Sequence, residues 1–232
     1  MKATKAYTRD LAEAYDRRHF GGRSGQYILQ RDVDALVSLI DPSPGVLVDI
    51  PSGTGVYVSA LKKQGLTTIA ADASWPMLEI TGHRTLAPRV LCDIYHLPFK
   101  SQSLKTTTTI RLLSHFPKEQ LPPMLKELSR VLKPQGRAIF DSFRWTPRRW
   151  PLLRHFIEQS YIYVIDDRAM QTIIEEAGLE IADIRCLYIF SPIWLRKLPL
   201  VLLRALVWVE TLVPKPWRLR VFWAATPSER NV

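Results

Sequence analysis

Residues 46–65 constrain the fold more than any other part of the sequence. They read VLVDI, PSGTG and VYVSALKKQG: a short apolar run, a turn that contains two glycines, and a helical pattern that ends at Gly65. An apolar run of this length is typical of a strand that is buried on both faces. A strand, a tight turn and a helix in this order open a βαβ unit, so the segment predicts a parallel sheet.

The alternation of strands and helices continues along the chain. With 46–50, strands are expected at 67–72, 89–93, 106–110, 137–143, 180–190 and 218–226. Helices are expected at 6–40, 56–65, 118–136, 166–178 and 198–213, the first interrupted by glycines and the third by Pro122 and Pro123 near its start. The predicted fold class is α/β, with a mostly parallel seven-stranded sheet covered by helices on both faces. A length of 232 residues fits one domain of this kind.

Three aspartates stand where predicted strands end. Asp49 ends the first strand, Asp72 the second and Asp93 the third, while Gly53 and Gly55 form the first turn. Ligands of open α/β sheets lie at the carboxyl ends of the strands, and an acid after the second strand can accept hydrogen bonds from a ribose. Each aspartate alone is equally compatible with an ordinary turn. Together with the glycine turn, the three predict a nucleoside site.

Four ordered segments resemble the class I S-adenosylmethionine-dependent methyltransferases, in particular the small-molecule branch that includes ubiquinone and menaquinone methyltransferases. The segments are VLVDIPSGTG, TTIAADASWPML, DIYHLPF and LKELSRVLKPQGRAIF, between residue 46 and residue 143. The resemblance implies the Rossmann-like fold of that family and S-adenosylmethionine as the cofactor. It also implies a division into an N-terminal helical lid (1–40), a cofactor-binding core (46–143) and a substrate-side part (144–232).

The same resemblance assigns residues to the cofactor. Asp72 would hold the ribose, Met77 would line the adenine pocket and Asp93 would accept from the adenine amine. The full set that it implies is Asp49, Pro51, Gly53, Gly55, Asp72, Ala73, Met77, Asp93, Ile94 and Arg111. The sequence departs from the family pattern at three places. Pro51 replaces a glycine and has no N–H to donate, Gln135 replaces a glycine before the fifth strand, and Leu104-Lys105 stands where phenylalanine-aspartate is usual.

Methyl transfer needs a base only when the acceptor atom begins protonated. The candidates are His115, beyond the fourth strand, and Asp141, near the end of the fifth; each is also compatible with a structural role. Tyr7, Tyr15 and His19 belong to the N-terminal segment and are candidates for contact with the substrate. No carboxylates are spaced for magnesium, and Cys92 and Cys186 lack a metal-binding spacing, so no metal is expected.

Basic and apolar residues gather in the C-terminal part of the chain. The formal net charge is +10, and arginines and tryptophans recur in 144–154 and in 192–220, on both sides of the apolar stretch 198–213. This composition suits an anionic membrane interface and equally suits a solvated basic face. The N-terminus lacks the apolar core of a secretory signal. We therefore expect a cytoplasmic protein with peripheral membrane contact.

The leading hypothesis is methyl transfer to a small apolar acceptor such as a quinone, a polyketide or a lipid. An RNA or protein methyltransferase that uses the basic surface is the first alternative. It is disfavoured because IRLLSHF (110–116) replaces the asparagine-proline-proline-tyrosine type of motif, so nucleic acid is not the expected partner. A degenerate domain that binds cofactor or a partner without catalysis is the second alternative, supported by Pro51 and Lys105 alone. The sequence does not define an oligomeric state.

Overall fold

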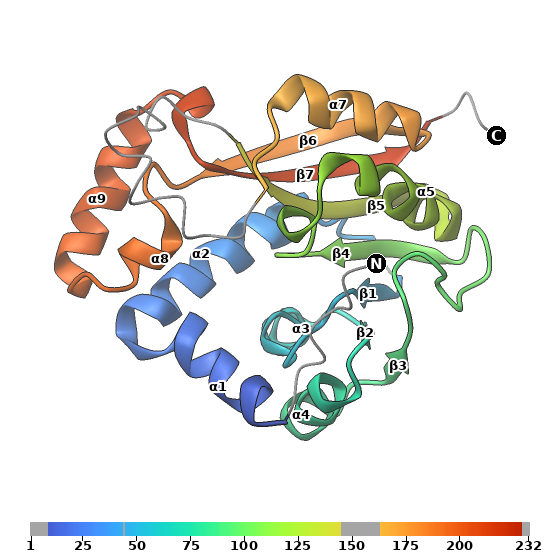
Figure 1. The fold of residues 1–232 in the computed structure, drawn as a ribbon, viewed down its shortest axis with the longest axis horizontal. Helices are drawn as coiled ribbons and strands as arrows, with labels where there is room; N and C mark the ends of the chain where they lie inside the picture. Colours follow the sequence, from blue (N-terminus) through green and yellow to red (C-terminus); the bar gives the residue numbers. More distant parts are fainter. Residues whose placement is uncertain (1–8, 44, 145–162, 229–232) are drawn as a thin grey trace.

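A computed structural model of the protein describes residues 9–43, 45–144 and 163–228 (Figure 1). Tyr7 and almost all of the basic segment 144–154 lie outside these residues. The described chain forms a seven-stranded sheet in the order β3-β2-β1-β4-β5-β7-β6. Its strands are β1 (Leu47–Asp49), β2 (Thr68–Asp72), β3 (Arg89–Leu91), β4 (Leu104–Thr109), β5 (Leu132–Phe143), β6 (Leu179–Leu187) and β7 (Arg220–Pro227).

The prediction of a mostly parallel sheet is confirmed. Strands β3, β2, β1, β4 and β5 are parallel neighbours, whereas β7 runs antiparallel to both β5 and β6. The carboxyl ends of the parallel strands therefore meet at one edge of the sheet, where the nucleoside site is expected. The helices are α1 (Arg9–Phe20), α2 (Gly22–Leu39), α3 (Val56–Lys63), α4 (Trp75–Thr85), α5 (Leu121–Val131), α7 (Asp167–Glu176), α8 (Pro192–Leu195) and α9 (Leu200–Leu212).

Helices pack on both faces of the sheet because side chains alternate along the strands. On β5, Ala138 and Phe140 belong to the core under α5 and α7, whereas Ile139 belongs to the core under α2 and α3. Strand β7 follows the same rule, with Val221 on the first side and Phe222 on the second. The central residues of both strands, 138–140 and 221–225, are apolar on both faces, which is why they appear in the sequence as continuous apolar runs.

Two helices differ from the expectation. Helix α4 is not predicted by the sequence, because WPMLEITGHRT contains a glycine and β-branched residues that form helices weakly. Pro122 and Pro123 do not interrupt a helix; they stand in the first turn of α5, where a missing N–H costs nothing. A short 3₁₀ turn, Lys118–Gln120, precedes them.

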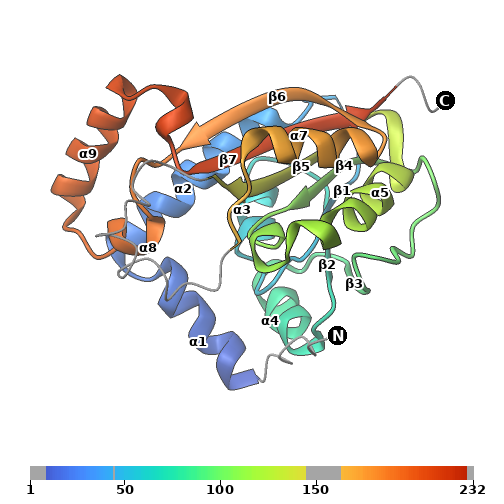
Figure 2. The same ribbon diagram turned by 45° about the horizontal axis from the view of Figure 1, so that its top comes forward.

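Helix α9 lies at one end of the molecule, outside the layers that cover the sheet (Figures 1 and 2). Within the described residues, no helix is both long enough and apolar enough to cross a bilayer.

Candidate functional site

The turn between β1 and α3 takes the shape that its glycines permit. Ile50–Pro51 is a cis peptide, and Gly53 and Gly55 have φ angles of 53° and 76°. A Cβ at Gly53 would meet no atom within 4 Å, whereas a Cβ at Gly55 would lie 2.8 Å from Thr81 Cγ2. Gly53 therefore faces open space that a ligand can approach closely, and Gly55 is needed for packing against α4.

Asp72 is at the end of β2, as predicted, and it is tied to the turn. Its Oδ2 accepts the Gly53 N–H at 2.8 Å, and its Oδ1 accepts the Ser74 N–H at 2.8 Å. Burial raises the pKa of this carboxyl, while the backbone N–H groups of Ser74 and Gly53 oppose the shift. Each carboxylate oxygen keeps a second lone pair, so Asp72 can still accept hydrogen bonds from a ligand that lies over Gly53.

Asp49 ends β1 and is buried, with 1% of its surface exposed. The Thr108 hydroxyl donates to Asp49 Oδ1 at 2.5 Å, while Oδ2 is buried with no hydrogen-bond partner among the described residues. Burial, helped by the negative charge of Asp72, raises the pKa of Asp49 to about 7 despite the Thr108 hydrogen bond. An unpartnered buried oxygen beside an open turn is what a site for a donor group or a cation requires.

Buried apolar side chains lie where the adenine of the cofactor is expected. Met77 and Ile94 are buried, at 4% and 8% exposure, whereas Ala73 and Asp93 are exposed. Asp93 does not end a strand: β3 stops at Leu91, and Asp93 Oδ1 accepts the Tyr95 N–H at 3.0 Å in a turn. That prediction about β3 is wrong by two residues, and the carboxylate nevertheless lies at the carboxyl side of the sheet.

Helix α1 contacts α4 and is fastened to the glycine turn (Figure 2). The Thr54 hydroxyl donates to Asp16 Oδ1 at 2.5 Å, and the Arg84 guanidinium pairs with the other oxygen of Asp16. Arg84 also donates to the Thr54 carbonyl at 2.8 Å. Helix α1 is thus held against the glycine turn at Asp16.

The C-terminal half of α1 carries the rings of Tyr15, His19 and Phe20. Tyr15 stacks on His19 with 4.1 Å between the ring centroids, and Phe20 meets Tyr57 edge to face at 6.1 Å. The Arg111 guanidinium lies 5.1 Å from the centre of the Phe20 ring. Two of the expected substrate contacts, Tyr15 and His19, therefore lie together on the helix that reaches Arg111 through Phe20.

His115 and Arg111 follow β4. Arg111 has a φ of 63°, and its Nη1 is buried with no hydrogen-bond partner in the part of the chain that the structure describes. His115 ends a 3₁₀ turn, Leu113–His115, and is exposed. Desolvation by the protein around the ring lowers the pKa of His115, with Arg111 acting in the same direction and Asp141 in the opposite one. The imidazole is therefore favoured in its neutral form, which can accept a proton.

Asp141 has no oxygen turned to solvent. Its Oδ1 accepts the Arg111 N–H at 2.6 Å, and its Oδ2 accepts from Arg220 Nε at 2.7 Å, with both side chains of the ion pair about 1% exposed. A carboxylate held on both oxygens and buried does not meet the geometry of a general base. The arrangement assigns Asp141 to holding Arg111 and Arg220 in place.

The pairing of Arg220 continues into a buried network that the sequence does not indicate. Arg220 Nη1 donates to Asp32 Oδ2 at 2.6 Å, and the hydroxyls of Tyr57 and Tyr188 donate to Asp32 at 2.9 and 2.7 Å. Burial and the neighbouring carboxylate of Asp32 raise the pKa values of both tyrosines, so both remain donors. One feature of the sequence could have indicated this network: Asp32 is an acid on the face of α2 that also carries Ile28, Leu36 and Leu39, all of which are buried.

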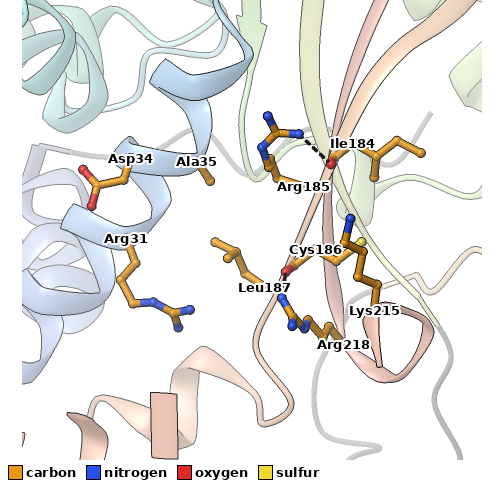
Figure 3. Close-up of a pocket in the computed structure, with 9 residues that line it drawn as sticks. All are labelled: Arg31, Asp34, Ala35, Ile184, Arg185, Cys186, Leu187, Lys215 and Arg218. Atoms are coloured by element: carbon orange, nitrogen blue, oxygen red, sulfur yellow. Dashed lines mark hydrogen bonds between the residues drawn. The ribbon is translucent and has the colours of Figure 1, made fainter. Parts of the chain in front are cut away.

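A cavity of about 270 Å³ lies away from this site, between α2 and the C-terminal half of β6 (Figure 3). Arg31 and Asp34 line it from α2, Arg185 from β6, and Lys215 and Arg218 from the chain that follows α9. Arg31 pairs with Glu210, and Arg218 donates to the carbonyl of Cys186, which also lines the cavity, and to that of Val213. Among the described residues, no group of three or more metal-ligating side chains is assembled.

Comparison with known proteins agrees with this geometry. Residues 48–140 match a family described as a methyltransferase domain. Demethylmenaquinone methyltransferase of Corynebacterium kroppenstedtii is 29% identical over 163 residues, which cover 60% of this chain and 70% of that protein. Probable tRNA methyltransferase 9B of Mus musculus is 37% identical over 103 residues, which cover 44% of this chain and only 22% of that protein.

Among solved structures, geranyl diphosphate C-methyltransferase from Streptomyces coelicolor has a TM-score of 0.67 at 16% identity. The match covers 87% of this chain and 80% of that one, which was crystallised with S-adenosyl-L-homocysteine. At this identity the likeness shows the fold alone.

Proposed function

We propose that this chain, which carries a class I S-adenosylmethionine-dependent methyltransferase domain, transfers the methyl group to a small apolar acceptor. The observation that supports the choice of acceptor is the aromatic series on α1. Tyr15, His19 and Phe20 lie together at the C-terminal end of α1, and Phe20 lies against Arg111, which follows β4. Aromatic rings favour flat or apolar molecules, because they bury a large area at low conformational cost.

The residues at the sheet edge fit the cofactor. Gly53 leaves space where a side chain would intrude, Asp72 retains lone pairs for the ribose hydroxyls, and Asp49 offers an unpartnered buried oxygen to a donor group. Met77 and Ile94 supply an apolar surface for the base. When bound, S-adenosylmethionine supplies an electrophilic methyl group, and the protein contributes binding, orientation and exclusion of water.

Helix α1 acts in this proposal as the lid. Asp16 fastens it to Thr54 and Arg84, so cofactor exchange requires this clasp to open. Closure would exclude water from the methyl group and bring the α1 rings over the acceptor.

His115 is the proposed base for an acceptor that begins protonated, such as a phenol. Desolvation favours its neutral form, and its partial exposure leaves a route for the proton to solvent. His115→Gln should lower kcat by about two orders of magnitude or more, with KM for the cofactor unchanged. If His115→Gln still binds cofactor but loses the same fraction of kcat at every pH between 5 and 8, His115 would have a packing role instead.

A radiolabelled methyl group reveals the acceptor class before the acceptor itself is identified. The protein is incubated with methyl-labelled S-adenosylmethionine and, separately, with a lipid extract, total RNA and a protein lysate. Label in the organic phase of the lipid extract supports the proposal. Label in RNA would support the alternative suggested by the net charge of +10 and by the tRNA methyltransferase 9B match. Absence of label with bound cofactor would support a domain without catalysis.

Peripheral contact with a membrane forms part of this proposal, because apolar acceptors of the quinone or lipid kind reside there. A demethylmenaquinone methyltransferase is among the relatives, and that name suggests a quinone for this chain.

A further inference from the structure

We infer that the outward face of α9 is a docking surface for an anionic phospholipid membrane. The inference deepens the proposed function, because it states how the domain would reach an apolar acceptor. It stands on the exposure, periodicity and charge of residues 192–219, and each of these is independent of the cofactor site.

Helix α9 is apolar on the side that faces solvent. Val201, Leu202, Trp208, Val209 and Leu212 are exposed to 78, 54, 66, 40 and 69%. Ala205 lies between them and is also exposed. At 100° per residue, positions 201, 202, 205, 208, 209 and 212 share one face of about 120°. The outward side of α9 is therefore a continuous apolar stripe, whereas a surface helix ordinarily presents polar residues there.

The orientation of α9 is fixed by its other face. Leu203 is fully buried, and Glu210 is 3% exposed and paired with Arg31 of α2 in a two-pronged contact of 2.9 and 3.2 Å. Leu203 and Glu210 are separated by two helical turns, so together they define one inward line. A rotation of α9 that brought the apolar stripe inward would move Glu210 away from α2. Arg31 would then be buried without its partner, or the contact between the two residues would be exposed to solvent.

Tryptophans and cations surround the stripe. Trp194 and Trp217, at the two ends of the segment, are 59% and 58% exposed, and Lys197 lies 5.5 Å from the Trp194 ring. Arg204 and Lys215 are exposed. The one acid in the sequence between residues 192 and 219 is Glu210, which is buried. Tryptophan rings and basic groups beside an apolar helix face match the headgroup region of an anionic bilayer.

Charge favours a membrane over a second copy of the chain. Two copies that paired through this stripe would bring Lys197, Arg204 and Lys215 of one against the same cations of the other, with no exposed acid in the segment to compensate. Phosphate headgroups supply that compensation. Spanning is not an option for α9, since 13 residues extend only about 20 Å against a hydrocarbon core of about 30 Å.

Co-sedimentation of the full chain with vesicles tests the surface. Phosphatidylcholine vesicles are compared with vesicles that contain one-third phosphatidylglycerol, at low and at high salt. We expect binding to the anionic vesicles alone and a loss of at least about tenfold between roughly 50 mM and 500 mM salt. The double variant Trp208→Ser, Leu212→Ser should bind at least about tenfold more weakly at low salt.

The matched control is Leu91→Ser, which removes a leucine of similar exposure (55%) from β3, at the opposite edge of the sheet. It should bind vesicles like the wild type. The charge variant Lys197→Glu, Lys215→Glu should lose binding while leaving the apolar stripe intact. Thermal melting verifies that each variant is folded, and calorimetry with S-adenosylhomocysteine separates docking from the cofactor site, since cofactor affinity should be unchanged in all of them.

Three results would overturn the inference. The first is a wild type that stays in the supernatant at low salt, and the second is a serine double variant that binds as well as the wild type. The third is a dimer, detected by light scattering, that only this double variant dissociates, which would assign the stripe to self-association. Failure of methyl transfer with intact vesicle binding would instead count against the proposed function alone.

Discussion

The surroundings of Asp49 allow a quantitative prediction of how the free energy of unfolding depends on pH. Its carboxyl is buried beside Thr108, its Oδ2 is unpartnered among the described residues, and burial raises its pKa to about 7. In the unfolded chain the same group titrates near a pKa of about 3.9. Between these values the folded state holds a proton that the unfolded state has released. The free energy of unfolding of the cofactor-free protein therefore decreases as the pH rises through this window.

The size of the effect follows from the shift. About three pH units at about 1.4 kcal/mol each give a loss on the order of 4 kcal/mol, complete slightly above pH 7. The part between pH 5 and pH 8 is about 3 kcal/mol by the same relation. Asn resembles protonated Asp in shape, and its oxygen can still accept from Thr108 Oγ1, as Asp49 Oδ1 does at 2.5 Å. Asp49→Asn should therefore be more stable than the wild type by about 1.5 kcal/mol at pH 5 and by about 4 kcal/mol at pH 8, so the difference widens by about 3 kcal/mol over this range.

Urea unfolding of both proteins at pH 5, 6, 7 and 8 measures this difference, because other titrating groups contribute equally to both. Thr108→Val is the companion variant. It removes the hydroxyl that favours the ionised form of Asp49, so the decline of stability should begin at the same low pH and extend further upward. Parallel stability curves for wild type and Asp49→Asn would refute the reasoning and indicate that Asp49 is ionised and solvated throughout.

Three further predictions concern the turn and the buried network. Asp72→Ala should weaken S-adenosylmethionine binding at least tenfold, since a charge-assisted hydrogen bond contributes about 1.5–3 kcal/mol; unchanged calorimetric affinity in the folded variant would exclude Asp72 from the site. Gly53→Val should fold, as judged by circular dichroism, yet not bind the cofactor, and normal binding would place the nucleoside elsewhere. Arg220→Met should cost about 3–5 kcal/mol in urea unfolding by leaving Asp32 and Asp141 without their cation, and adding Asp32→Asn should recover part of it; a cost below about 1 kcal/mol is incompatible with a buried pair.

The sequence is sufficient where the determinants are local. The run VLVDI, the glycine turn and the next helix are neighbours in the chain, so β1, the turn and α3 are predicted within two residues of their bounds. Asp49 and Asp72 follow from the ends of β1 and β2. Their surroundings do not follow, because the pKa of Asp49 depends on Thr108, 59 residues away, and on the lack of a partner for Oδ2 in the described chain.

Non-local pairs explain what sequence reasoning misjudges. Asp141 has the residue type and the strand-end position of a base, yet Arg220, 79 residues later, occupies one of its oxygens. The clasp of α1 joins Asp16 to Arg84 across 68 residues, and neither residue belongs to a motif. Helix α4 escapes prediction because weak helix formers are stabilised there by contacts with β2, β3 and α1. In each case packing decides the role, and a single sequence does not encode packing as a local pattern.

Helix α2 connects the proposed docking surface to the site through two adjacent residues. Arg31 reaches outward to Glu210 of α9, whereas Asp32 reaches inward to Arg220 at 2.6 Å. Arg220 holds Asp141, and Asp141 in turn accepts the N–H of Arg111. Residues one position apart on a helix point about 100° apart, so one rigid helix can serve both directions. Loss of Glu210 should therefore release α9 while leaving the Asp32 network intact, and loss of Asp32 should loosen Arg111 while leaving the docking surface in place.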